Sequence, residues 1–254
     1  MPKESKIIMR PFLSIACVLA LLGGAANGET VDFNTAGAMD QFRKVHAGDG
    51  PGAWKWQSDA GVNGSGGLVA ENYAGTSVLV LQKGIERTVS TPIRMSVLFQ
   101  WHEPVFGIGH GFFVGVGLTP DYLPAVAGQK EKPTAEQLYV GVGRRETPNS
   151  ARLVGATASQ GEMAMYHSHE TVELEPGQWY RLRAELTPEG ERLRVALQLE
   201  KWKAGVEGEV ISTFEFLTQP VPVLLKARQW YPFLGSGPNA VHRGVRAVDE
   251  LTIE

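Results

Sequence analysis

The sequence predicts an all-β protein folded as a two-sheet sandwich. Short apolar stretches rich in Val, Leu, Phe and Tyr recur between Gly, Pro, Asn and Asp residues, a pattern typical of all-β domains. Helical periodicity is nearly absent. About a dozen such stretches imply two packed sheets, because one open sheet of that size is unusual. No linker-like tract divides residues 29–254, so we expect a single domain there.

The apolar stretches give the positions of the expected strands, each bounded by turn-forming residues. In chain order they cover residues 31–33, 41–45, 67–70, 77–81, 93–102, 111–118, 137–144, 151–156, 163–167, a hairpin at 172–199, 210–217, 223–230 and 248–253. The aromatic cluster 230–233 is interpreted as core followed by a rim loop.

The expected hairpin at 172–199 has the clearest alternation of inward and outward side chains. The inward residues are Tyr180, Leu182, Ala184, Leu186, Leu193, Val195, Leu197 and Leu199. The outward residues include Arg181, Arg183, Arg192 and Arg194, so a slip of one residue would bury charges. Residues 187–190, Thr-Pro-Glu-Gly, are expected to turn the chain, because proline presets φ and glycine accepts a positive φ. We interpret this hairpin as a core-building element.

Two expected strands, 111–118 and 138–145, share the run Val-Gly-Val-Gly. Their glycines lie on the same face as Phe113 and Tyr139. Interior glycine marks a sharp bend or a place where another group approaches the backbone. Two interpretations follow: a sheet that needs curvature, or an open floor carrying two aromatic rings on which a sugar ring could lie. The connection 119–135 would border such a floor.

The strand at 93–102 has one apolar face and one face that carries polar side chains. Polar groups beside an aromatic platform suit sugar hydroxyls and the apolar face of a pyranose. The polar face could therefore join the glycine floor, and the alternative is an ordinary solvated face. The predicted carbohydrate-binding residues are Arg94, Gln100, His102, Phe113, Tyr139 and Arg145.

The N-terminal segment, residues 1–28, is predicted to be a signal peptide. Lys3, Lys6 and Arg10 precede an apolar run at 11–22 and then a stretch of small residues, with cleavage expected after Gly28. The run is too short to span a bilayer, which takes about 20 apolar residues, and no later segment is longer. We therefore expect a secreted or periplasmic protein without a transmembrane segment. Its single cysteine lies in the signal peptide, so no disulfide is expected in the mature domain.

Charge argues against nucleic acid as a partner. The chain has 24 basic and 27 acidic residues and a formal net charge of −3. Nucleic acid and anionic membrane surfaces select basic proteins, so a neutral partner is the better fit.

Two pairs of side chains could carry chemistry. Glu173 and Glu175 share a strand face at about 7 Å, a spacing compatible with paired-carboxylate hydrolysis, although two glutamates on a solvated strand end are the ordinary explanation. His167 and His169 share a strand face and could bind zinc or copper with a third ligand, which the sequence does not identify. No Gly-x-Ser-x-Gly elbow, phosphate-binding loop or cysteine cluster is present.

Several segments resemble the concanavalin A-like lectin and glucanase superfamily. The features are Pro-Gly-Gln-Trp-Tyr-Arg-Leu at 176–182 and Val-Asp-Glu-Leu-Thr-Ile at 248–253. Val-Asp-Phe-Asn at 31–34 and Gly-Val-Asn-Gly-Ser-Gly-Gly-Leu at 61–68 are similar to its laminin-G-like bacterial members. The resemblance implies a jelly roll whose concave sheet face or rim loops receive oligosaccharide. Glucanases of this superfamily carry a Glu-x-Asp-x-Glu strand, and this sequence has none.

These observations favour a secreted, non-catalytic, lectin-like protein whose partner is an oligosaccharide or polysaccharide. The first alternative is a glycoside hydrolase or lyase whose acids lie outside the known motif. The second is a structural or adhesive domain of the cell envelope. No cofactor is indicated, except for a structural calcium ion that Asp32 and Asp249 could hold where the first and last strands meet.

Overall fold

The computed structural model describes residues 29–47, 54–70, 76–88, 90–101, 110–120, 135–144, 149–236 and 245–254. The predicted signal peptide, most of the connection 119–135, and His102 and Arg145 lie outside these ranges. Within the ranges, no helix is both long and apolar enough to cross a membrane.

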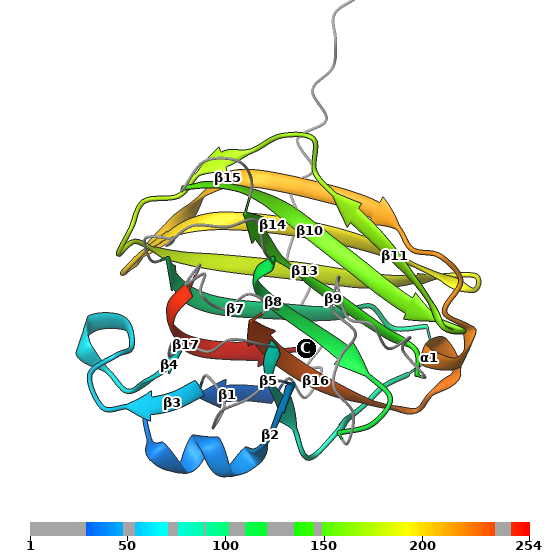
Figure 1. The fold of residues 1–254 in the computed structure, drawn as a ribbon, viewed down its shortest axis with the longest axis horizontal. Coiled ribbons are helices and arrows are strands. Elements are labelled where there is room, and N and C mark those ends of the chain that lie inside the picture. The colour runs from blue at the N-terminus through cyan, green and yellow to red at the C-terminus, as the bar shows by residue number, and fades with distance from the viewer. Residues whose placement is uncertain are drawn as a thin grey trace, which may run out of the picture.

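Two antiparallel sheets form the protein (Figure 1), which confirms the predicted all-β, two-sheet class. Sheet A contains, in spatial order, β15 (Val206–Leu217), β14 (Arg192–Lys203), β13 (Trp179–Glu189), β7 (Ile93–Trp101), β17 (Val245–Ile253), β4 (Gly67–Ala70) and β3 (Trp54–Gln57), with β1 (Glu29–Asp32) paired to β17. Sheet B contains β11 (Glu162–His167), β10 (Ser150–Ser159), β9 (Gln137–Arg144), β8 (His110–Gly117), β16 (Gln229–Ser236), β5 (Thr76–Leu81) and β2 (Phe42–Ala47). Two short strands extend sheet B, since β12 (Val172–Glu173) pairs with β10 and β6 (Ile85–Glu86) pairs with β16.

The core lies between the two sheets. All eight residues predicted to face inward from the hairpin are buried there, with at most 3% exposure. Burying a large aliphatic or aromatic side chain contributes about 1.5–3 kcal/mol, so the alternation along β13 and β14 sets both the register and much of the stability.

The hairpin is shorter than predicted at its start and longer at its tip. It begins at Trp179, because Val172–Glu173 pairs instead with β10 of sheet B. Its strands continue to the pair Glu189 and Arg192, so the turn lies at residues 190–191 and not at 187–190. Gly190 has φ +63°, the positive value for which glycine is favoured in a two-residue hairpin loop.

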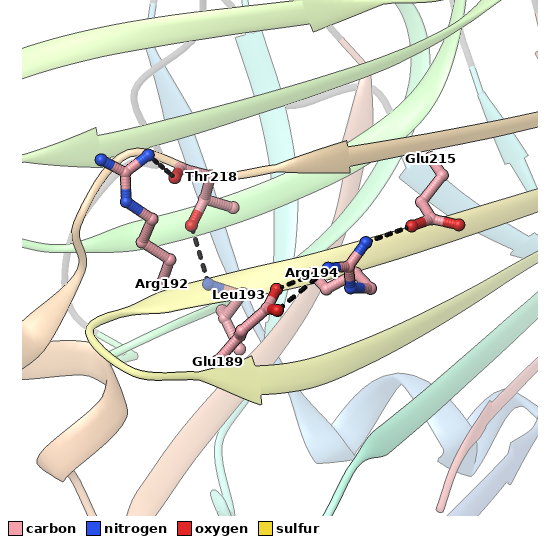
Figure 2. Close-up of polar contacts among 6 residues, drawn as sticks. All are labelled: Glu189, Arg192, Leu193, Arg194, Glu215 and Thr218. Carbon is pink, nitrogen blue, oxygen red and sulfur yellow. Dashed lines mark hydrogen bonds and ion pairs between the residues drawn. The ribbon is translucent and has the colours of Figure 1, made fainter.

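Polar side chains around the tip of the hairpin pair with one another (Figure 2). Arg194 Nη2 contacts both carboxylate oxygens of Glu189 at 2.9 Å, and its Nη1 contacts Glu215 at 2.6 Å. The hydrogen bond to Glu215 is the largest cause of a raised pKa of Arg194, and the hydrogen bond to Glu189 is the next largest. Thr218 Oγ1 accepts the buried Leu193 N–H at 2.9 Å. These contacts fix the tip of β14 against β15 and leave little free charge there.

The expected strand at 223–230 is wrong. Residues Pro222–Lys226 form the short helix α1, and the strand that follows is β16, which includes the whole cluster 230–233. Pro222 favours the first turn of a helix, where its missing N–H costs nothing. The cluster is therefore part of sheet B and not a rim loop.

Buried polar groups attach α1 to the sandwich. The buried Glu136 carboxylate accepts the Leu224 N–H at 2.7 Å and the Ser159 hydroxyl at 2.8 Å. The Trp230 indole donates to the Leu224 carbonyl at 2.8 Å, and the Arg87 guanidinium lies 4.2 Å above the Trp230 ring. Burial lowers the pKa of Arg87. The helix thus closes one end of the sandwich next to the start of β9.

Candidate functional site

The structure does not bring the six predicted carbohydrate-binding residues together. Arg94 and Gln100 lie on the outer face of β7 in sheet A, whereas Phe113 of β8 and Tyr139 of β9 lie on the outer face of sheet B. The expectation that the polar face of 93–102 joins the glycine floor is wrong, because β7 pairs with β13 and β17 of the other sheet. Each outer face is therefore a separate candidate.

Phe113 and Tyr139 do lie together. Their ring centroids are 5.1 Å apart, and Phe233 lies 6.2 Å from Phe113. Gly115 pairs across the sheet with both Tyr139 and Phe233, and Gly235 pairs with Phe113. A Cβ added at Gly115 would lie 2.5 Å from Phe233 Cζ, and one added at Gly235 would lie 2.8 Å from Phe113 Cζ. The glycines therefore make room for aromatic rings on the neighbouring strands.

This aromatic layer is closed to solvent. Phe113 and Tyr139 are each 1% exposed, and Phe233 is 2% exposed. With Val78, Val80 and Ala156 these rings form a second, smaller hydrophobic cluster. The interpretation of the glycine strands as an open floor is wrong, because the rings pack against the sheet and one another.

A buried polar side chain lies on the same face as the aromatic layer. Gln137 is 1% exposed, and among the described residues neither its amide oxygen nor its amide nitrogen has a hydrogen-bond partner. Gly117 of β8 separates it from Tyr231 of β16, and glycine places no side chain between them. An unsatisfied buried amide is rare and costs about 1–3 kcal/mol. Sequence reasoning missed Gln137, because a glutamine at a strand start is ordinary until its burial is known.

On sheet A, both predicted residues have protein partners. Arg94 Nε contacts Glu185 Oε2 at 2.8 Å, and Gln100 Nε2 donates to the Gly177 carbonyl at 2.8 Å. The arginines of this face are also paired: Arg183 with Glu200 at 2.8 Å, and Arg181 with Glu250 at 3.9 Å. The charges of Arg94, Arg181 and Arg183 on this face are therefore compensated.

Glu173 and Glu175, the two glutamates considered as catalytic acids, do not stand alone as a pair of carboxyl groups. Glu175 Oε1 accepts Lys201 Nζ at 2.6 Å, and the Glu175 N–H donates to the Tyr180 hydroxyl at 2.8 Å. Glu173 is exposed and belongs to β12, ahead of the hairpin. Burial raises the pKa of Tyr180. Glu175 therefore fixes the chain at the entrance to β13.

The proposed metal ligands are not supported by the geometry. In the part of the chain that the structure describes, no group of three His, Cys, Asp or Glu side chains could hold a metal ion. Asp32 and Asp249 lie where β1 meets β17. The Asp32 carboxylate accepts the Asn34 N–H at 2.7 Å, and the Asp249 carboxylate accepts the Val62 N–H at 2.8 Å. Burial raises the pKa of Asp249. The two carboxylates stabilise the neighbouring loops.

Comparison with known proteins settles the fold. No protein-family model and no curated protein matches the sequence significantly. The lectin UEA-II in complex with galactose has a similar structure, with a TM-score of 0.52 and 11% identity over 89% of this chain and 97% of that one. The chain has the concanavalin A-like lectin fold. This confirms the resemblance that the sequence motifs indicated.

Other proteins with the concanavalin A-like fold are equally distant in sequence. Arcelin-5, a lectin-like defence protein from Phaseolus vulgaris, has a TM-score of 0.51 and 11% identity over 90% of this chain and 98% of that one. The metal-free carbohydrate recognition domain of Emp46p has a TM-score of 0.50 and 8% identity over 85% of this chain and 88% of that one. At such identities the likeness concerns the fold alone.

Proposed function

We propose that this protein is a secreted, non-catalytic, lectin-like protein. In this proposal the sugar docks on the outer face of sheet B beside the half-buried Tyr231, and its binding uncovers the buried Gln137 amide. The unpaired, buried amide of Gln137 carries this proposal. The fold supports it, since it is shared with a lectin in complex with galactose and with a carbohydrate recognition domain. The signal peptide predicted at residues 1–28 supports export.

The chemistry around Gln137 suits a sugar. A glutamine amide offers two donors and one acceptor, which match adjacent hydroxyl groups. Tyr231, half-buried on the far side of Gly117, could contact the apolar face of a pyranose. In this proposal the buried rings of Phe113 and Tyr139 form the base that holds these strands in place. A mostly apolar site with a few placed polar groups is typical of small-ligand recognition.

A non-catalytic role agrees with the surroundings of the glutamates. Glycosidases need two carboxylates that flank the bond to be cleaved. Glu175 is instead engaged by Lys201 on the surface of sheet A, on the opposite layer from Gln137.

Replacing Gln137 with methionine is expected to weaken sugar binding at least ~10-fold and to stabilise the protein by ~1 kcal/mol. Methionine has nearly the same shape and removes the unsatisfied amide, so a residue kept for packing alone would show only the gain in stability. Glycan-array screening followed by titration calorimetry measures binding, and urea denaturation measures stability.

Gln82→Met is the matched control, because the exposed Gln82 amide donates to the Asp40 and Phe42 carbonyls far from Gln137. It should leave sugar affinity unchanged and should not stabilise the protein. Unaltered sugar affinity in Gln137→Met would show that the amide plays no part in recognition.

A further inference from the structure

Two of the six tryptophans, Trp179 and Trp202, differ from the other four because their indole rings are both partly exposed and without a hydrogen-bond partner among the described residues. The indole N–H groups of Trp54, Trp56 and Trp230 donate to backbone carbonyls at 2.8–3.2 Å, and Trp101 is fully buried. Trp179 and Trp202 are partly exposed, and within the described residues their indole N–H groups have no protein partner. Tryptophans of this kind are typical of binding surfaces, where one part of the ring packs and its N–H stays available.

Trp179 and Trp202 lie next to each other on the outer face of sheet A. Tyr180 pairs with Lys201 across β13 and β14, so the preceding and following residues, Trp179 and Trp202, are also opposite one another. The Gln178 side-chain amide donates to the carbonyls of both tryptophans at 2.8 Å, which holds the two strands together there.

Gln100 continues this row on the next strand. It pairs with Trp179 across β7 and β13, so Trp202, Trp179 and Gln100 stand on three neighbouring strands. Adjacent strands are about 4.8 Å apart, so the row extends about 10 Å across the sheet. Gln100 Nε2 donates to the Gly177 carbonyl, and its Oε1 accepts no hydrogen bond from the residues that the structure describes.

Unsatisfied polar atoms lie directly beside this row. Arg181 follows Trp179 by two residues on β13, and Glu200 precedes Trp202 by two residues on β14. All four side chains therefore share the same face of sheet A. Arg181 Nε and Glu200 Oε2 are both buried and have no hydrogen-bond partner in the part of the chain that the structure describes, and Glu200 is only 5% exposed. These two atoms are independent evidence that this face lacks hydrogen-bond partners that a ligand would supply.

The charges of the face indicate which ligand it would take. The three arginines nearest the row, Arg94, Arg183 and Arg181, are paired with Glu185, Glu200 and Glu250 respectively, so the charge beside the tryptophans is compensated and does not favour an ionic polymer. Flat indoles stack on the C–H faces of pyranose rings, and free N–H and amide oxygen atoms suit hydroxyl groups.

We propose that Trp179, Trp202 and Gln100 form a second binding surface, which takes a neutral polysaccharide. It lies on the opposite layer from Gln137 and does not depend on the site proposed there. A protein with a glycan site on each layer could bridge two segments of one polymer, which would raise its effective affinity.

Affinity electrophoresis tests the proposal directly. The purified protein is run through gels that contain neutral polymers (hydroxyethylcellulose, galactomannan or xyloglucan) or anionic ones (alginate or pectate). We expect at least one neutral polymer, and neither anionic polymer, to retard the protein. The double substitution Trp179→Ala and Trp202→Ala should reduce that retardation at least 10-fold, and replacing both with phenylalanine should restore part of it.

The double alanine substitution made together with Gln137→Met separates the two sites, because the loss of Trp179 and Trp202 should still reduce retardation at least 10-fold when the Gln137 amide is absent. Val223→Ala, which removes an exposed apolar side chain on α1, serves as a surface control. The proposal is overturned if no neutral polymer retards the protein, if the double alanine variant is retarded as strongly as the wild type, or if the tryptophans are needed only for an anionic polymer. A protein partner captured through these tryptophans in place of a glycan would also overturn it.

Discussion

Gly141→Ala is expected to destabilise the protein by roughly 3 kcal/mol or more, enough to prevent folding in many small domains. A Cβ at this position would collide with the Phe112 carbonyl oxygen and would lie 2.8 Å from Phe113 Cα. Both are backbone atoms of β8, next to the irregular pairing between His110 and Phe112, so no side-chain rotation relieves the contact. Urea denaturation of the purified variant measures the loss.

Gly37→Ala is the matched control for this substitution. A Cβ at Gly37 would meet only Thr35 Oγ1, at 3.9 Å, and its position in a short 3-10 helix tolerates alanine. We expect a change within about 1 kcal/mol, in the stabilising direction. If Gly141→Ala and Gly37→Ala changed the free energy of unfolding by the same amount, the close approach of β8 to β9 would be contradicted.

Trp230→Ala is expected to cost about 3–5 kcal/mol. The substitution removes a ring that is 1% exposed, its hydrogen bond to the Leu224 carbonyl, and the surface on which the Arg87 guanidinium lies. Arg87 would then lose part of its buried environment, and α1 would lose its attachment to β16. Thermal unfolding monitored by circular dichroism, together with urea denaturation, gives the change in stability.

Trp230→Phe keeps an aromatic ring beneath Arg87 but cannot donate to Leu224. It should therefore cost markedly less than Trp230→Ala. If the two variants were equally unstable, the hydrogen bond to Leu224 and not the packed ring would hold α1.

The alternation of side chains was sufficient to predict most of sheet A and much of sheet B. In the hairpin, inward residues such as Leu182 and Leu197 were identified correctly because an alternating strand has only one register that buries them. The helix α1 was not predicted, because three apolar residues after a proline, Val223, Leu224 and Leu225, fit a buried strand equally well. The helix is favoured by Glu136, whose carboxylate accepts the Leu224 N–H although the two residues are 88 positions apart in the chain.

The candidate sites could be predicted only in part, because they depend on which strands become neighbours. The sequence identified Gln100 and Tyr139 as outward-facing but could not show that they belong to different sheets. Trp179 already had outward parity next to the buried Tyr180, and this signal could have identified the surface on sheet A. Its partner Trp202 became evident only from the pairing of β13 with β14.

The glycine strands illustrate the same limit. Val-Gly-Val-Gly is compatible with an open floor and with a packed layer, and the cross-strand neighbours decide between them. Here Gly115 and Gly235 lie beside aromatic rings, so that Phe233 and Phe113 occupy the space a side chain would take, whereas a Cβ at Gly143 would meet Val154. A single sequence does not reveal which residues pair across strands that are far apart in the chain.

A two-dimensional ¹H–¹⁵N NMR titration tests glycan recognition on the outer faces most directly. The protein has six tryptophans, so six indole signals are expected, and the side-chain amide of Gln137 can be assigned by substitution. On addition of galactose and neutral oligosaccharides, we predict that the Gln137 amide and the indoles of Trp179 and Trp202 shift, while those of Trp54 and Trp230 stay in place. If no sugar in the panel moved any of the first three signals, the protein would not be a lectin of the kind proposed.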